Sequence, residues 1–431
     1  MKPMAGVLPR VAIVASQASL QMGGEGALAV HHFRGLLARQ VPVYLVCHAR
    51  ARPELQQLLP EAQHRIVYAP DSWLQQLLWR LGQCLPQRVQ AASTAVLIHW
   101  LTQRRQLPLV KALVQAQQIN LVHQPMPVSP REPSCLTGLG VPVVMGPMNG
   151  NMDYPPGLAH REPLWVWALV HYARQMSALA NRWCVGKLQA DLLLVANART
   201  RNALPPQARG RVVEMVENGV DLAQWPPRVW PAVAPGQPVA VRFCFVGRLV
   251  GWKAVDLLLR AFAVARSQSK GPMQLDIVGS GPQARRLRQL ASTLGLTVAQ
   301  PHAPAGVVFH GWQSQAGCSQ ILTTSDALVL PSLLECGGAV VLEAMASAVP
   351  VIAAHWGGPA DYLDARCGLL VPVTSETTLI TGLANAMLRL AGDFDLRRRL
   401  GQAGRNKVEA EHAWHLKTER MLGLYQSVLK S

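Results

Sequence analysis

Acidic residues, phenylalanine and tyrosine are scarce in this chain. The 431 residues include 24 Asp and Glu against 41 Lys and Arg, and only six Phe and six Tyr. The resulting formal net charge of +17 predicts attraction to an anionic partner. Nucleic-acid binding calls for basic residues clustered with stacking aromatics, whereas the Lys and Arg here are scattered. We therefore expect an anionic membrane surface or a phosphorylated substrate, and no nucleic acid, as partner.

Long apolar runs and closely spaced cysteines are also lacking. No run reaches the roughly 18 to 20 apolar residues that cross a bilayer. The five apolar residues 11–15 fall short of the ~7 to 15 that form the core of a signal peptide, so we interpret them as a buried first strand. The eight cysteines lack the short spacing of a zinc or thioredoxin-like site. These features predict a cytoplasmic protein with reduced thiols.

The length and the apolar content predict two folded domains. With 50% hydrophobic and 15% charged residues, the chain is not disordered, and 431 residues exceed one ordinary core. Five prolines within residues 225–238 prevent a helix or a central strand there. We predict an N-terminal domain at residues 1–222, a proline-rich linker at 223–239 and a second domain at 240–410. The C-terminal helix, residues 411–431, is expected to pack back toward the N-terminal domain.

Continuous apolar runs alternate with helical stretches in both halves. Continuous rather than alternating runs indicate strands covered on both faces, as in a parallel sheet between helices. In the first half the runs are residues 11–15, 41–46, 119–123, 141–145 and 192–196. In the second half five strands are expected at residues 241–246, 274–278, 307–310, 327–330 and 351–354, separated by helices. Each half therefore predicts a doubly wound α/β domain of the Rossmann type.

Two helical stretches in the first half mix tryptophan with arginine. They cover residues 72–90 and 158–191. Tryptophan beside basic side chains suits docking on an anionic membrane surface. A helix that faces the core and carries a solvated basic face has the same composition. The pattern leaves both interpretations open.

The most informative segment is residues 331–346, which follows a strand and opens a helix with glycines. Backbone N–H groups at a helix start with small residues approach a phosphate closely, and the helix dipole favours its charge. We place a phosphate at Gly337, Gly338, Ala339 and Val340. Glu335 precedes this helix start and Glu343 lies within the helix. The two carboxylates are expected to accept hydrogen bonds from the sugar and from the ribose of a nucleotide sugar.

Two further loops follow strands of the second half. Arg248 and Lys253 follow the strand at residues 241–246 and suit neutralisation of a diphosphate. The loop at residues 279–282 begins with Gly279 but lacks the third glycine of a dinucleotide fingerprint.

Residues 393–395 form an acid-x-acid string of the kind used by metal-dependent transferases, but they precede a basic helix. We interpret the string as a helix cap and expect no metal.

The segment 241–371 resembles the donor half of glycosyltransferase family 4, retaining enzymes of the GT-B fold. The resemblance extends over nearly the whole chain, through Gly23-Gly24 in the first half and residues 218–221. The matching pieces in the second half are Gly247-Arg248-Leu249 with Lys253, residues 278–282, 310–312 and 330–332, the Glu335 and Glu343 pair, and residues 349–353 and 368–371. The expected fold is α/β, with two Rossmann-like doubly wound parallel-sheet domains facing across a cleft. The resemblance implies that residues 1–222 form the acceptor side and that residues 240–410 bind the nucleotide sugar.

The resemblance implies roles for donor-binding residues. Glu335 would contact hydroxyls of the donor sugar and Glu343 the ribose. Arg248 and Lys253 would hold the diphosphate, together with the loops of Gly247 and Gly279 and the helix start. The loop around Trp312 would contact the base. The co-substrate would be a UDP- or GDP-sugar, with no other cofactor.

The resemblance is less specific on the acceptor side. Gly24 would approach the phosphates across the cleft, and His123 lies near where the family has cleft residues. Many relatives carry a His-Gly pair where this chain has residues 144–150 without histidine, so Asn149 and Asp153 become acceptor-side candidates. The lost histidine leaves open which residue, if any, activates the acceptor.

The function that this resemblance implies is transfer of a hexosyl group, with retention of configuration, to a lipid-linked or cell-envelope glycan. The acceptor would be of lipopolysaccharide or exopolysaccharide type, and the protein would be peripheral on the inner face of the membrane. An α-glucan synthase or a sugar-nucleotide epimerase of the same fold is an alternative. A non-catalytic cationic protein that binds membranes or nucleic acid is a second alternative.

Overall fold

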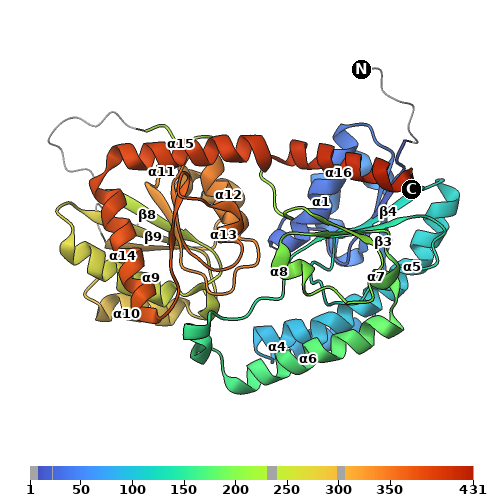
Figure 1. Cartoon of the computed structure of the whole chain (residues 1–431), viewed down its shortest axis with the longest axis horizontal. Helices are drawn as coiled ribbons and strands as arrows, with labels where there is room; N and C mark the ends of the chain where they lie inside the picture. Colours follow the sequence, from blue (N-terminus) through green and yellow to red (C-terminus); the bar gives the residue numbers. More distant parts are fainter. Residues whose placement is uncertain (1–7, 22, 231–239, 299–305, 431) are drawn as a thin grey trace. The chain divides into compact units, whose positions relative to one another are not determined.

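The computed structural model describes residues 8–21, 23–230, 240–298 and 306–430. The chain forms two compact units, each built around one parallel sheet (Figure 1). The first unit combines Met1–Asn151, Glu162–Asn218 and Trp414–Ser431, and the second combines Met152–Arg161 and Gly219–Ala413. Two α/β units with doubly wound sheets confirm the predicted fold class.

The first unit contains a seven-stranded sheet in the order β3-β2-β1-β4-β5-β6-β7, with every neighbouring pair parallel. The strands are β1 Val11–Val14, β2 Val43–His48, β3 Ile66–Ala69, β4 Leu121–Gln124, β5 Val143–Met148, β6 Leu192–Val195 and β7 Arg211–Glu214. The helices are α1 Gly24–Ala38, α2 Arg52–Leu58, α3 Trp73–Gln83, α4 Gln87–Ala92, α5 Thr94–Ala116, α6 Leu164–Trp183, α7 Gly186–Gln189, α8 Ala198–Arg201 and α16 Trp414–Leu429. The central strands β1, β4, β5 and β6 are buried along their whole length, as continuous apolar runs predict.

The second unit contains a six-stranded parallel sheet in the order β10-β9-β8-β11-β12-β13. The strands are β8 Val241–Val246, β9 Met273–Val278, β10 Gly306–Gly311, β11 Ala327–Leu330, β12 Val351–Ala354 and β13 Gly368–Val371. The helices are α9 Val255–Gln268, α10 Ala284–Thr293, α11 Gln315–Thr324, α12 Ala339–Ala346, α13 Pro359–Tyr362, α14 Glu376–Gly392 and α15 Phe394–Glu411. Strand order reverses between β8 and β11, and open α/β sheets bind ligands at such a switch point.

The sheets are wider than the sequence predicted. The prediction of five strands for the second sheet is wrong by one, because β13 forms an edge, and the first sheet adds β3 and β7. These strands have four residues each and lie at or near a sheet edge, where partial exposure weakens the apolar signal. The predicted helical stretches at residues 72–90 and 158–191 are also interrupted. Pro86 separates α3 from α4, and Pro163 precedes α6.

The division into units differs from the predicted domains in two places. It falls between Asn218 and Gly219, so residues 223–230 group with the second unit, while 231–239 of the predicted linker lie outside the described residues. Residues 152–161 also belong to the second unit, although the chain on both sides belongs to the first. Arg161 explains this grouping, since it pairs with Asp256 of α9 and Glu376 of α14 at 2.5 and 2.9 Å.

Helix α16 belongs to the first unit and contacts α1. Its Met421 and Tyr425 are buried in the core cluster that also holds Leu28 and Phe33 of α1. The last helix of the chain thus completes the core that the first strand begins. Among the described residues, none of the helices is both long enough and apolar enough to span a bilayer.

Candidate functional site

The predicted donor residues of the second unit lie in loops at the carboxyl ends of β8, β9, β10 and β11 and in helix α12. β8 and β11 flank the switch point of the sheet, and their loops carry Lys253 and Glu335. The Lys253 Nζ contacts Glu335 Oε2, and both side chains are largely shielded, at 16% and 12% exposure. A backbone bond from Leu333 N to Trp252 O, 2.7 Å long, fixes the two loops together. The structure therefore brings these two predicted residues into direct contact.

Glycines let the first two of these loops pack backbone to backbone. Gly279 has φ +131°, and a Cβ there would lie 1.9 Å from the carbonyl oxygen of Gly247. A Cβ on Gly281 would lie 2.4 Å from the oxygen of Leu249, whose N–H donates to Ser280 O. Only glycine fits such close approach. The predicted residues Gly247 and Gly279 thus shape the site through their backbones.

The start of α12 has the geometry of an anion-binding helix terminus. Gly338 precedes the helix with φ 78°, and no side chain caps the first-turn N–H groups of Ala339 and Val340. Uncapped N–H groups at a helix start attract a negative charge. Glu335 lies against this turn, since a Cβ on Gly338 would lie 3.0 Å from Glu335 Cγ. Gly337 is buried beside it.

Sequence reasoning missed the loop that supports this turn. Gly358 donates its N–H to the carbonyl oxygen of Glu335 at 2.8 Å. A Cβ on Gly358 would lie 2.3 Å from the oxygens of both Cys336 and Gly337. The neighbouring Gly357 has φ +77°, and a Cβ there would come similarly close to the carbonyl oxygen of Glu335. The Gly-Gly-Pro string after β12 is the signal that could have predicted this contact.

Glu343 lies within α12, and the residue as a whole is half-buried. Its carboxyl group is the buried part, and this burial raises the pKa of the carboxyl to about 7. A carboxyl with this pKa changes its charge near neutral pH, so its capacity to accept hydrogen bonds is pH-dependent. Arg248 is exposed in the loop after β8, and Trp312 is 69% exposed after β10. Both side chains are accessible to a ligand at the carboxyl edge of the sheet.

His123 is placed differently from the expectation of a cleft residue. Its side chain is completely buried at the end of β4, and both ring nitrogens are engaged. Nε2 donates to the carbonyl oxygen of Gly146 at 2.6 Å, so Nδ1 accepts from the Tyr425 hydroxyl at 2.7 Å. Burial lowers the pKa of His123 to about 4, in agreement with a neutral ring. This geometry gives no support to a catalytic role and indicates a structural histidine.

The acceptor-side candidates fall into different units. Asn149 is buried in the first unit, where it donates to Glu217 at 2.9 Å and accepts from Arg199 at 2.9 Å. Asp153 is exposed in the second unit, and its carbonyl oxygen accepts from the indole of Trp356. The roles of Asn149 and Asp153 at an acceptor stay predictions. Gly24 begins α1 in the first unit, and its predicted approach to the donor phosphates also stays a prediction.

The acid-x-acid string at residues 393–395 is a helix cap. Asp393 precedes α15, and its carboxylate accepts from Leu396 N at 2.7 Å, which confirms the predicted cap. Over the described ranges, no group of three His, Cys, Asp or Glu residues is arranged to hold a metal.

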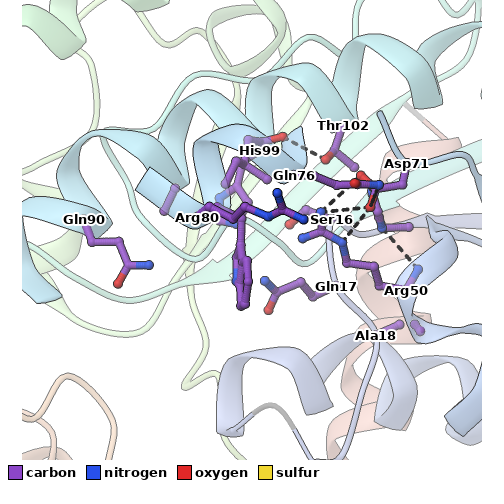
Figure 2. A pocket seen from close by; sticks show the side chains of 15 residues that line it. Ser16, Gln17, Ala18, Arg50, Asp71, Gln76, Arg80, Gln90, His99 and Thr102 are labelled. Carbon is purple, nitrogen blue, oxygen red and sulfur yellow. Dashed lines mark hydrogen bonds and ion pairs between the residues drawn. The ribbon is translucent and has the colours of Figure 1, made fainter. Parts of the chain in front are cut away.

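A cavity of about 590 Å³ lies in the first unit, at the carboxyl ends of β1, β2 and β3 (Figure 2). Ser16 and Gln17 follow β1, His48 and Arg50 lie at and just after the end of β2, and Asp71 follows β3. Helices α3, α4 and α5 supply the other side of the lining. A volume of several hundred Å³ is typical of small-molecule sites. The sequence analysis did not find this cavity, because its lining comes from six separate segments without a motif.

Comparison with known proteins assigns the chain to a family. Residues 240–407 match the family described as Glycosyl transferases group 1. The α-maltose-1-phosphate synthase of Mycolicibacterium smegmatis is 31% identical over 292 residues, which cover 62% of this chain and 71% of that protein. The D-inositol 3-phosphate glycosyltransferase of Saccharomonospora viridis is 31% identical over 268 residues, 59% of this chain and 57% of that protein. The chain spans about half the length of several such relatives.

Solved structures share the fold along nearly the whole chain. The Anabaena protein HepE, crystallised in complex with UDP, superposes with a TM-score of 0.62 at 16% identity, covering 97% of this chain and 100% of that one. At this identity the match concerns the fold, which is GT-B. The family match, the 31% identity to the synthase and this architecture agree. The chain belongs to the glycosyl transferases group 1 family.

Proposed function

We propose that the chain is a retaining glycosyltransferase. It moves a hexosyl group from a UDP- or GDP-sugar to a lipid-linked or cell-envelope glycan of lipopolysaccharide or exopolysaccharide type. The observation that carries the proposal is the contact between Lys253 and Glu335 beside the uncapped start of α12. A cation, a carboxylate and an anion-binding turn within one site suit a sugar joined to a diphosphate. The family membership and the UDP bound to HepE support this donor class.

Each group of the site has a distinct role on this proposal. Glu335 accepts hydrogen bonds from hydroxyls of the donor sugar, and the first-turn N–H groups of α12 hold the diphosphate. Glu343 accepts from the ribose hydroxyls, and Trp312 covers the base. Arg248 and Lys253 add positive charge at the diphosphate. This is the charge that a metal ion supplies in other transferases.

Transfer breaks the bond between the anomeric carbon and the diphosphate oxygen. The bonding electrons leave with that oxygen, so negative charge develops where Lys253, Arg248 and the α12 start lie. The acceptor hydroxyl attacks from the face that the diphosphate leaves, which retains configuration. Its proton passes to the departing phosphate, so the step needs no protein base. Asn149 and Asp153 are proposed on the acceptor side, and Gly24 is proposed to approach the donor phosphates.

The proposed localisation is cytoplasmic, peripheral on the inner face of the membrane. The net charge of +17 favours an anionic surface. Exposed tryptophans on α3 and α6 support the same location. Transfer to a lipid-linked glycan takes place at such a surface.

A thermal-shift screen tests the donor part of the proposal. Nucleoside diphosphates and their sugars are added to the full chain, and a ligand at 100 times its Kd adds about 2.7 kcal/mol of stability. We expect one base to give a clear shift that Glu335→Ala reduces for the sugar nucleotide more than for the free diphosphate. Absence of any shift with UDP, GDP or their sugars would sink the proposal.

The product distinguishes the alternatives. Radiolabelled donor sugar is expected in a lipid-extractable or high-molecular-mass glycan, with the anomeric configuration of the donor by NMR. A linear α-glucan as product would indicate a synthase, and a changed sugar still bound to its nucleotide an epimerase. A non-catalytic cationic protein would retain its full function in Glu335→Ala.

A further inference from the structure

The cavity of the first unit contains buried polar atoms without hydrogen-bond partners. Ser16 is 4% exposed, and within the described residues its Oγ makes no hydrogen bond. The same holds for Nε2 of the buried His48, which lies 3.5 Å from Asp71 Oδ1. A buried polar atom without a partner costs about 1 to 3 kcal/mol. A ligand that carries hydroxyls would satisfy both atoms.

The charges around the cavity are balanced except at Arg80. Arg50 donates to Asp71 from Nε and Nη2 at 2.9 to 3.1 Å, and His99 pairs with Glu132 at 2.8 Å. Arg80 is exposed at the lining, and no ion pair of it occurs in the part of the chain that the structure describes. Figure 2 shows Arg80, Ser16 and Gln76 among the side chains that line the cavity. A ligand with one anionic group would complete this charge pattern.

Neutral side chains complete a lining suited to a sugar ring. Gln76 and Gln90 offer amides that both donate and accept, as vicinal hydroxyls require. Trp79 offers an apolar ring face, and it is half exposed at the cavity. The lining therefore matches a polyhydroxylated ring that bears one negative charge.

The helix that carries Arg80 continues as an exposed apolar surface. Trp73, Leu77 and Leu81 of α3 recur at helical spacing and are all exposed. Gln76 and Arg80 directly precede Leu77 and Leu81 in α3, and both line the cavity. The cavity thus borders the apolar surface of α3.

Helix α6 carries a second exposed apolar stripe. Its buried residues Val166 and Val170 pack with Val89 of α4, and Figure 1 shows the two helices side by side. A different face carries exposed apolar residues at steps of three and four. They are Trp165, Leu169, Tyr172, Met176, Leu179 and Trp183. Because these side chains are exposed, no element among the described residues of the unit covers this face. A large contiguous apolar surface that stays exposed marks an interaction site.

The charge of these helices identifies the partner as an anionic surface. Helices α3, α4, α5 and α6 contain no Asp or Glu. Their cationic residues are Arg80, Arg88, Arg104, Arg105, Lys111, Arg174 and Arg182. Tryptophan and leucine interleaved with cations suit the interface of a bilayer with anionic headgroups. Exposed Trp165 and Trp183 at the two ends of α6 would anchor it in the plane of that interface.

We propose that the surface formed by α3, α4, α5 and α6 docks on an anionic bilayer, and that the adjoining cavity binds the polar head of a lipid-anchored acceptor. That head is a sugar joined to the lipid through a phosphate, with the hydroxyls at Ser16, His48 and Gln76 and the phosphate at Arg80. This inference rests on the proposed function and narrows its acceptor to a glycan held in the membrane.

Vesicle flotation tests the docking surface. The full chain is mixed with phosphatidylcholine vesicles, with and without phosphatidylglycerol. We expect binding to the anionic vesicles, and roughly tenfold weaker binding for the double variant Trp165→Ser/Trp183→Ser, since two anchoring rings are lost. Trp312→Ser is the matched control, an exposed tryptophan of the second unit, and should bind as the wild type does. Equal flotation of the double variant and the wild type overturns the docking surface.

Calorimetry with synthetic acceptors tests the cavity. The probes are decyl phosphate diesters of glucose, galactose and N-acetylglucosamine in anionic vesicles, with the free sugar 1-phosphates as anchor-free controls. We expect at least one diester to bind more tightly than its free phosphate, and Arg80→Gln to weaken it about tenfold. Arg209→Gln, an exposed arginine outside the surface, should leave the affinity unchanged. No binding by any diester, or equal binding by Arg80→Gln, refutes the cavity.

Ser16→Ala provides a readout that a structural role would not produce. Because the Ser16 hydroxyl has no partner to lose, the melting temperature should stay the same or rise, while diester affinity falls about fivefold. A lower melting temperature with unchanged affinity contradicts the assignment. Donor binding separates the two proposals: a chain that takes up UDP or GDP but ignores vesicles and diesters keeps its proposed function and loses only this inference.

Discussion

The two units differ in how the carboxyl edge of their sheet is built, which is where a ligand would bind. In the second unit, loops after β8, β9 and β11 are fixed by backbone contacts at Gly247, Gly279 and Gly281, and Lys253 already contacts Glu335. In the first unit, the edge of β1, β2 and β3 opens into a cavity with partnerless polar atoms beneath exposed apolar helices. The difference indicates that the second unit has a site fixed by its backbone, whereas the cavity of the first is lined in large part by side chains of α3, α4 and α5.

The largest effect is expected at the ion pair of the second unit. Lys253→Ala and Glu335→Ala should each lower kcat/KM roughly 100- to 1000-fold, since on the proposed function each removes a group that meets developing charge or the donor sugar. The matched control is Lys270→Ala, an exposed lysine of the same unit that should retain full activity. Because the two groups touch, the double variant should lose less than the product of the single losses. Near-normal transfer by either single variant would show that the preformed pair is not used.

A glycine comparison tests whether backbone packing fixes the second site. Gly279→Ala places a Cβ 1.9 Å from Gly247 O at φ +131°, so we expect the free energy of unfolding to fall by about 2 to 4 kcal/mol. Gly271→Ala meets nothing within 4 Å and should change stability by less than about 1 kcal/mol. Urea unfolding of both variants measures the difference. Equal midpoints would remove the contrast drawn between the two units.

Glu343 offers a test by pH. Burial raises its folded pKa to about 7, so the folded state prefers the protonated form and loses stability as the pH rises through 7. Glu343→Gln stays neutral and should exceed the wild type by about 1 to 2 kcal/mol at pH 8 but not at pH 4. Affinity of the wild type for the nucleoside diphosphate should rise between pH 6 and 8, as the carboxylate accepts ribose hydroxyls. A flat affinity profile in calorimetry would argue against ribose contact.

The smallest effect concerns the histidine of the first unit. Tyr425→Phe removes the hydroxyl that donates to His123 Nδ1 and should destabilise the fold by about 1 kcal/mol. Turnover per folded molecule should not change, because both His123 nitrogens serve buried contacts. Thermal unfolding and steady-state kinetics on the same sample measure the two effects. A fall in kcat at equal folded fraction would restore a role of His123 in the chemistry.

The sequence predicted the second unit better than the first for physical reasons. The strands β8, β11 and β12 fall at the predicted residues, because each is a largely apolar run of four to six residues, and Gly247 and Pro331 directly follow β8 and β11. Glu335 and Lys253 were each predicted for the donor site, and they meet because both follow strands at the switch point. The edge strands were missed, as was most of α5, where buried Gln103 and Gln106 and an internal Pro108 obscure the helical period.

Side-chain surroundings were harder to foresee than strands. His123 follows an apolar strand as a cleft residue would, and only the contact with Tyr425, 302 positions away, shows that its ring is buried. The cavity likewise depends on contacts between segments distant in sequence. The tryptophan-bearing helices could be named from sequence, but which of their faces packs and which stays exposed follows from the position of α4.

The interleaving of the units bears on how the chain is made. Met421 and Tyr425 of α16 lie in the core cluster of β1 and α1, so the first unit stays incomplete until α16 has been translated. The second unit has all its segments earlier and can consolidate on the ribosome while the first still exposes apolar surface. The part synthesised first is therefore the last to finish folding, and it is the part that would need a chaperone during synthesis.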